Sequence, residues 1–143
     1  MTARWIASAP LLLLLMLPAP AMAGTVDYSG HGTDDRKLDV SFKLVDREKL
    51  KDLAFDDARV KCDDGTKGRI GKRTFDFGIP LDGHNEFKAS GSGSSEGIKE
   101  ETARASGKVK IDRGRAVGVV KIKFEEDDGD MCHTREEPWK AER

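Results

Sequence analysis

Apolar and polar side chains alternate without a break in Leu38-Asp39-Val40-Ser41-Phe42-Lys43-Leu44. Successive side chains of a β-strand point to opposite faces, so this order puts the apolar residues on one face and Asp39, Ser41 and Lys43 on the other. A helix would instead need an apolar period near 3.6 residues. The stretch therefore predicts a strand with one face in a core and one face in water.

The same alternation recurs along the rest of the chain. It is clear at 58–62, 75–79, 109–111 and 116–124, and shorter strands are expected at 25–30, 85–90, 98–105 and 133–141. Glycine and aspartate suit the tight turns that join strands. Such turn signals are Asp64-Gly65, Asp82-Gly83, Arg113-Gly114 and Asp128-Gly129. The pattern predicts an all-β fold, a single antiparallel β-sandwich or β-barrel of about eight strands.

The buried faces of these strands should hold the phenylalanines. Aromatic residues at strand spacing are more typical of a packed core than of a cofactor site. The six are Phe42, Phe55, Phe75, Phe77, Phe87 and Phe124. High charge along the chain then belongs to the solvated faces and the turns.

Three segments are less clear. Glu48–Leu53 could form one helical turn, and Glu96–Ala105 could be read as a helix, although Thr102 and the nearby glycines favour a strand there. Gly91-Ser92-Gly93-Ser94-Ser95 has the composition of a flexible loop between strands, and it is too short to separate two domains.

The first 23 residues have the organisation of a signal peptide. Arg4 supplies positive charge, residues 6–17 form an apolar region that contains the run Leu11–Leu15, and Ala21-Met22-Ala23 matches the small-x-small pattern that precedes cleavage. The apolar run would span only ~18 Å as a helix, short of a bilayer core of ~30 Å, which disfavours an uncleaved anchor. We expect a signal peptide at 1–23 and a secreted β domain at 24–143. That domain would be secreted or periplasmic, with no transmembrane anchor after cleavage.

Both cysteines, Cys62 and Cys132, follow the expected cleavage site. Outside the cytoplasm a lone pair of cysteines usually oxidises, and two cysteines allow one intramolecular pairing. The C-x-x-C spacing of redox or metal sites is absent from the sequence. The sequence therefore predicts a disulfide between Cys62 and Cys132.

The charge balance excludes two classes of partner. The chain has 25 Lys and Arg against 26 Asp and Glu, a net charge of −1. A nucleic-acid-binding protein would need a basic excess. A polybasic module for membrane surfaces would need the same excess. We expect neither function.

No catalytic motif stands out. The sequence has no Gly-x-Ser-x-Gly elbow in a strand–turn–helix context and no phosphate-binding glycine loop. The three histidines, His31, His84 and His133, lie in or beside expected turns, and none is spaced as a metal-binding pair. They are expected to be exposed turn histidines, and we assign no catalytic residue.

Acidic residues flank both cysteines. Asp63-Asp64 follows Cys62, and Glu125–Asp130 ends two residues before Cys132. The disulfide would bring these stretches to one end of the domain, and Ca²⁺ binds clustered carboxylate oxygens. The spacing does not match an EF-hand loop, so the alternative is two solvated acidic turns. No cofactor other than calcium is suggested. The candidate ligands are Asp63, Asp64, Asp127, Asp128 and Asp130.

Tyr28 and Trp139 are the non-phenylalanine aromatic residues after the expected cleavage site. Alternation places Trp139 and Ala141 on one face, so we expect the last strand to dock into the core. A sugar ring could alternatively stack on Tyr28 or Trp139, although such surfaces usually present more aromatic rings.

Several short motifs carry a resemblance to a known group of proteins. They are Tyr28-Ser29-Gly30, Ser41-Phe42-Lys43, the strand and turn at Val60–Gly65, and the closing Cys132 with Trp139–Arg143. Their order and spacing resemble those of small secreted bacterial β-domain proteins of unassigned activity. The resemblance covers residues 25–143 and consists of structural positions. It implies the β fold and the extracytoplasmic compartment, and it implies no catalytic residue.

These observations predict a secreted or envelope-facing binding module that is not an enzyme. Its partner would be a protein, a glycan or a cell-surface polymer. One alternative is a small extracellular hydrolase whose carboxylates or histidines converge only in the fold. Another is an inhibitor of a secreted enzyme that presents Gly91–Ser95 as an exposed loop.

Overall fold

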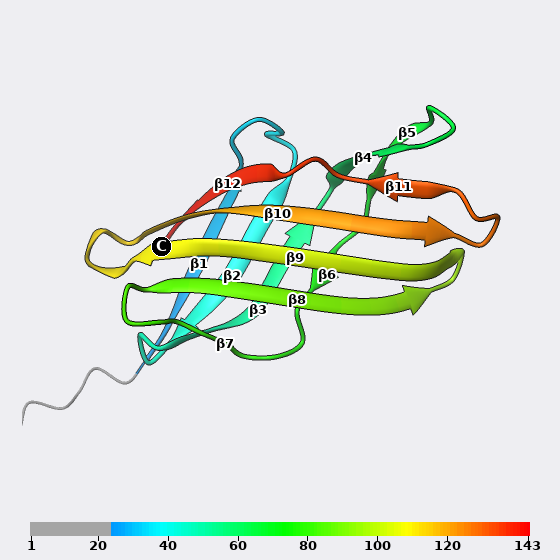
Figure 1. Ribbon diagram of the computed structural model, residues 1–143. Coiled ribbons are helices and arrows are strands. Elements are labelled where there is room, and N and C mark those ends of the chain that lie inside the picture. Colours follow the sequence, from blue (N-terminus) through cyan, green and yellow to red (C-terminus); the bar gives the residue numbers. More distant parts are fainter. Residues whose placement is uncertain (1–23) are drawn as a thin grey trace, which may run out of the picture.

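The computed structural model describes residues 24–143, which fold almost entirely into β-strands (Figure 1). The predicted signal peptide, residues 1–23, lies outside the described residues. No part of 24–143 forms a helix that could reach across a bilayer. The strands are β1 (Thr25–Gly32), β2 (Asp39–Val45), β3 (Lys49–Asp56), β4 (Ala58–Cys62), β5 (Lys67–Ile70), β6 (Arg73–Thr74), β7 (Ile79–Pro80), β8 (Glu86–Ser95), β9 (Ile98–Lys110), β10 (Arg115–Glu126), β11 (Met131–His133) and β12 (Glu137–Glu142).

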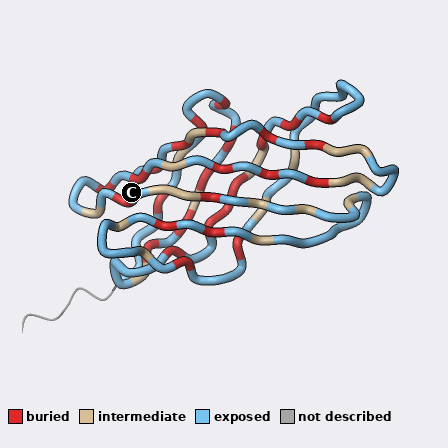
Figure 2. The backbone as a smooth tube through the Cα atoms, viewed as in Figure 1, coloured by how far each residue is buried: buried red, intermediate tan, exposed pale blue. Residues whose placement is uncertain are grey.

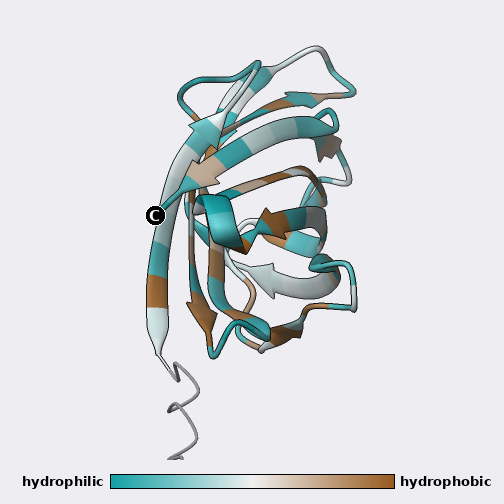
Figure 3. Cartoon of the chain, turned by 90° about the vertical axis from the view of Figure 1, so that its left-hand side faces the viewer, coloured by the Kyte–Doolittle hydropathy of each residue, from teal (hydrophilic) through white to brown (hydrophobic). Residues whose placement is uncertain are grey.

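The all-β class and the antiparallel pairing are confirmed. The strands number twelve in one sheet, more than the expected count of about eight. Part of the excess comes from short pieces, since β6 and β7 have two residues each. Hydrophilic and hydrophobic residues alternate along the strands (Figure 3), as the sequence pattern requires of a sheet with one wet face.

Strand β10 is the point at which the sheet divides. One edge of β10 pairs with β9 along its whole length. The other edge pairs first with β12, over Arg115–Val120, and then with β11, over Lys123–Glu125. The sheet therefore continues through β12 to β1, β2 and β3, and separately through β11 to β4 and β5.

Thr134 fills the gap where β11 ends and β12 has not yet begun. It is fully buried, and its backbone N–H donates to the carbonyl oxygen of Ile122 at 2.8 Å. Its hydroxyl oxygen accepts a hydrogen bond from the backbone N–H of Ile122 at 2.9 Å. These bonds satisfy the backbone of β10 exactly where strand pairing is interrupted.

The sheet from β8 through β10 and β12 to β3 curls into a half-barrel around one core (Figures 1 and 2). Trp139 of β12 lies in this core and is 1% exposed, as the sequence predicted. Its ring centroid lies 6.2 Å from that of Phe87 on β8, 6.0 Å from Phe55 on β3 and 6.4 Å from Phe42 on β2. Aromatic side chains from β8, on one side of β10, and from β2 and β3, on the other side, thus pack against the same indole.

The prediction of a flexible loop at Gly91–Ser95 is wrong. These residues form the second half of β8, with Ser92 opposite Thr102 and Gly93 opposite Glu101 of β9. The neighbouring strand β9 is 13 residues long and provides backbone partners, so pairing continues despite the low β propensity of glycine and serine. The inhibitor hypothesis thereby loses its proposed loop.

Both segments with a helical alternative are also strands. Glu48–Leu53 lies largely in β3, and Glu96–Ala105 lies largely in β9. The placement of Phe77 in the core is wrong, because this residue is 47% exposed. Phe77 follows β6 outside any strand, so alternation no longer decides which way it points. It packs edge-on against Phe75 with ring centroids 5.8 Å apart.

Candidate functional site

The disulfide lies at the far end of β10 from Trp139's core. Cys62 of β4 and Cys132 of β11 are bonded and directly opposed, with their Cα atoms 3.9 Å apart. Both are buried and form a second, smaller core with Val60 and Phe124. The bond confirms the predicted pairing and ties the arm of β4 and β5 to the main sheet.

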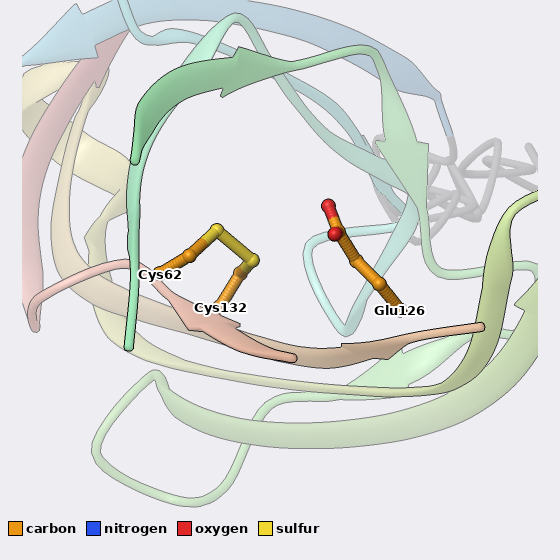
Figure 4. Close-up of side chains that lie close together, drawn as sticks. All are labelled: Cys62, Glu126 and Cys132. Carbon is orange, nitrogen blue, oxygen red and sulfur yellow. A yellow bond between two sulfur atoms is a disulfide. The ribbon is translucent and has the colours of Figure 1, made fainter. Parts of the chain in front are cut away.

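The two acidic stretches meet beside this disulfide, as expected. Carboxylate oxygens of Asp64 and Asp130 lie within 4.8 Å of each other and of the Cys62 sulfur. The carboxylate of Glu126 lies within 4.8 Å of both sulfurs (Figure 4). Three carboxyl groups, one from the end of β10 and two from the turns after β4 and β10, therefore gather at one end of the domain. We call Asp64, Glu126 and Asp130 the acidic cluster.

Crowding changes the proton affinity of the acidic cluster. Burial, followed by the charges of the neighbouring carboxylates, raises the pKa of Glu126 and of Asp130. Hydrogen bonds from Thr66 lower the pKa of Asp64, whose Oδ1 accepts from the Thr66 backbone N–H at 2.7 Å. The cluster thus combines one carboxylate that is readily ionised with two that resist ionisation.

The other candidate calcium ligands are used differently. Asp128 accepts a hydrogen bond from the backbone N–H of Asp130 at 2.9 Å, which shapes the turn. The backbone N–H of Asp127 donates to the carbonyl oxygen of Gly97 at 3.2 Å, and Asp63 lines a separate pocket. In the described part of the chain, each group of candidate metal ligands includes a cysteine already bonded to its partner. Calcium binding therefore stays a prediction.

The remaining candidates do not form a common site. Tyr28 is 2% exposed and stacks on Phe42 at 4.8 Å, so neither Tyr28 nor Trp139 offers a ring face to a sugar in this structure. His31 lies in β1, His84 in the turn before β8, and His133 in β11. No cluster of candidate metal ligands among residues 24–143 contains a histidine.

A concave pocket of about 570 Å³ lies at β4 and β11, and the buried Val60 and Cys62 form part of its wall. Alternation along β4 turns Val60 inward and leaves Arg59 and Lys61 exposed. Four cationic side chains and one histidine line the pocket, and two carboxyl groups oppose them. The cations are Arg59, Lys61, Lys67 and Arg135, the histidine is His133, and the acids are Asp63 and Glu137.

Most of this positive charge is uncompensated. Among the ion pairs of residues 24–143, none involves Lys61, Lys67 or Arg135. The Arg59 guanidinium lies 4.0 Å from the Glu137 carboxylate, a long contact for an ion pair. The pocket is therefore able to attract an anion.

Glu137 is the unusual acid of the pocket. It is 3% exposed at the start of β12, where it pairs with Val120 of β10. Burial raises the pKa of Glu137, the Arg59 charge partly opposes this rise, and the Asp35 charge adds to it. The ionised form of Glu137 is therefore disfavoured in the folded protein.

A buried ion pair fixes the arm that carries the pocket. Asp35 is 5% exposed and binds Arg69 of β5 through two contacts, at 2.6 Å and 3.0 Å. The backbone N–H of Arg59 also donates to Asp35, at 3.3 Å. The loop after β1 thus holds β4 and β5 in place, and Arg69 is committed to structure rather than to a ligand.

The sequence contains a signal for this pocket that no motif describes. Exposed basic or histidine side chains alternate with buried residues in Arg59-Val60-Lys61 and again in His133-Thr134-Arg135. Each stretch alone reads as an ordinary wet strand face. Only the pairing of β4 with β11 puts the two side by side.

Comparison with known proteins gives no further information. The chain matches no protein-family model, no curated protein and no solved structure.

Proposed function

We propose that this chain is an extracytoplasmic binding module, not an enzyme, and that it takes an anionic ligand in the pocket of β4 and β11. The observation that supports this most directly is the gathering of Arg59, Lys61, Lys67 and Arg135 around one concavity. The whole chain has a net charge of −1, so this gathering does not reflect a general excess of basic residues.

Two lysines of the pocket repel each other across β4 and β5. Lys61 lies directly opposite Lys67, and like charges in that position destabilise a sheet. A bound anion would replace this repulsion with charge-assisted hydrogen bonds. The ligand would thus stabilise the arm of β4 and β5 that holds it.

Titration calorimetry with inorganic tripolyphosphate at low ionic strength tests the proposal. We expect saturable binding that the double variant Lys61→Ala, Lys67→Ala weakens roughly tenfold or more. Lys43→Ala is the matched control, because Lys43 is an exposed strand lysine outside the pocket that lies opposite Asp27 on one side and Lys51 on the other. Absence of binding, or equal weakening by the control variant, would contradict the proposal.

The extracytoplasmic location is part of the proposal. It is supported by the signal-like sequence of residues 1–23 and by the disulfide. Mass spectrometry of the natively produced protein tests it. The expected mass is that of residues 24–143 less two hydrogens, and free thiols or an intact leader would contradict the location.

A hydrolase is the second candidate, and one observation favours it. The pocket holds Glu137, whose pKa is raised, together with His133, and a concave site with such groups is typical of acid–base chemistry. Glu137→Gln separates the two functions. It should abolish hydrolysis of an anionic ester if Glu137 transfers a proton, whereas anion binding should persist in a binding module.

A further inference from the structure

The positive charge of the pocket continues across the sheet along two neighbouring rows of paired residues. In the first row, Lys67 of β5 lies opposite Lys61 of β4, which lies opposite His133 of β11. His133 lies opposite Lys123 of β10. The row then crosses Thr102 of β9 and reaches Ser92 of β8. It spans six strands without a carboxylate.

The second row runs beside the first. Arg59 of β4 lies opposite Arg69 of β5, and Lys121 of β10 lies opposite Arg104 of β9. Arg135, two residues after His133, adds a further cation near the pocket. The cations of the two rows, together with Arg135, form what we call the basic band. Arg69 is left out because it is ion-paired. The members of the basic band are Arg59, Lys61, Lys67, Arg104, Lys121, Lys123 and Arg135.

Directly paired residues put their side chains on the same face of a sheet. The seven members of the basic band are all exposed. Apart from the long contact of Arg59, they form no ion pair within residues 24–143. Two carboxyl groups, those of Asp63 and Glu137, lie in the pocket at one end of the band. On β9 and β10 the next paired positions beyond Lys123 are Glu125 and Glu100, so the negative charges there lie beyond the basic band.

The geometry points to a linear polyanion that lies across the strands, and we propose this ligand class for the site described above. The inference depends on the proposed function. Neighbouring strands are about 4.8 Å apart, so the three steps from Lys67 to Lys123 cover about 14 Å. A single small anion can contact only the pocket, whereas a chain with repeated negative groups can contact the pocket and the β10 lysines together.

The band lacks a feature that single-stranded nucleic acids need. Their bases stack on exposed aromatic side chains. The large exposed aromatic residue of the described chain is Phe77, which lies between β6 and β7 and not on the band. The structure therefore favours an anionic polymer without bases, such as a polyphosphate or an acidic glycan.

Chain length is the variable that tests this inference. Orthophosphate, tripolyphosphate and long-chain polyphosphate are titrated into the full protein by calorimetry. We expect the affinity of long-chain polyphosphate, per binding site, to exceed that of tripolyphosphate by more than about tenfold, and to fall more steeply with salt because more counterions are released. Dextran sulfate and polygalacturonate in parallel titrations assign the preferred anionic group.

Variants locate the contact. Lys123→Ala and Lys121→Ala lie outside the pocket, so each should reduce the ratio of long-chain to tripolyphosphate affinity. Lys61→Ala should weaken the binding of both tripolyphosphate and long-chain polyphosphate. Lys43→Ala, with Asp27 opposite it, should change neither.

The outcomes are distinguishable. Equal affinity for tripolyphosphate and long-chain polyphosphate would overturn the polymer inference and leave the anion pocket standing. No binding of either would overturn both. A single-stranded DNA oligomer of matched charge that binds more tightly than polyphosphate would overturn the choice of a polymer without bases.

Discussion

Gly118 of β10 lies directly opposite Trp139 of β12, and the indole occupies the space beside its missing side chain. A Cβ atom at Gly118 would lie 2.5 Å from Cζ2 of Trp139. On the other side, Gly107 of β9 pairs with Gly118, and a Cβ there would lie 2.9 Å from Cε1 of Phe87. The paired glycines thus leave the space above the sheet that the side chains of Trp139 and Phe87 occupy.

Gly118→Ala is therefore expected to destabilise the fold by about 1–3 kcal/mol, because the added methyl group overlaps the backbone carbonyl oxygen of Ser106 on β9 and also displaces a fully buried indole. Urea denaturation followed by circular dichroism measures the loss. Gly68→Ala is the control, since Gly68 lies in β5 with open space around its Cβ position. It should change stability by no more than about 0.5 kcal/mol. A tolerated Gly118→Ala would show that both the backbone of β9 and the aromatic core can shift.

Removing the disulfide should lower the free energy of unfolding by more than Gly118→Ala does. The bond closes a loop with a sequence separation of 70, for which chain entropy predicts about 4 kcal/mol. The variant with both Cys62 and Cys132 changed to alanine also loses packing in the smaller core. Urea titrations of the oxidised protein, the reduced protein and the double variant check this. Reduced and oxidised protein unfolding at the same urea concentration would contradict the expectation.

Alternation in the sequence was sufficient to predict much of the fold. In β2 and β10 each side chain faces either core or water, so the pattern specified both the strand and its buried face. The pairing of Cys62 with Cys132 needed no geometry, because two cysteines have one possible partner each. The meeting of Asp64 with Asp130 followed from that bond.

The division of the sheet at β10 could not be predicted, because it depends on which strands pair. Lys61, His133 and Lys123 are separated along the chain and become neighbours only through pairings of β4, β11 and β10. Glu137 reads as one more exposed charge in a polar stretch before Pro138, yet it is buried. Its burial comes from its pairing with β10 and from the loop that carries Asp35.

Glu137→Gln should stabilise the protein at neutral pH and have less effect at acidic pH. Burial raises the folded-state pKa of Glu137 above the unfolded value, so the folded state binds the proton more tightly. Stability therefore falls as pH rises through the window between the unfolded and folded pKa values, and the full penalty is present above it. Glutamine carries no charge and avoids that penalty.

Thermal melts of wild type and Glu137→Gln from pH 4 to pH 8 measure this difference. The melting temperatures should separate as pH rises. The same variant removes a negative charge from the anion pocket, so tripolyphosphate should bind it more tightly at pH 7. A variant that is less stable than wild type at pH 7 would show that the contact of Glu137 with Arg59 outweighs the cost of burial.

Millimolar calcium should raise the melting temperature if the acidic cluster binds it. Asp64, Glu126 and Asp130 lie around the disulfide. Burial and, after it, the charges of neighbouring carboxylates raise the pKa of Glu126 and Asp130, and a bound divalent cation would relieve that repulsion. Asp130→Asn should remove most of this calcium effect.

Without calcium the same variant should be more stable than wild type near neutral pH, because a raised folded-state pKa means that the ionised form is disfavoured. Asp112→Asn, at an exposed position of η1 (Ile111–Arg113) far from the cluster in sequence, should leave the calcium effect unchanged. An unchanged melting temperature, together with no heat of calcium binding, would leave the cluster as two solvated acidic turns.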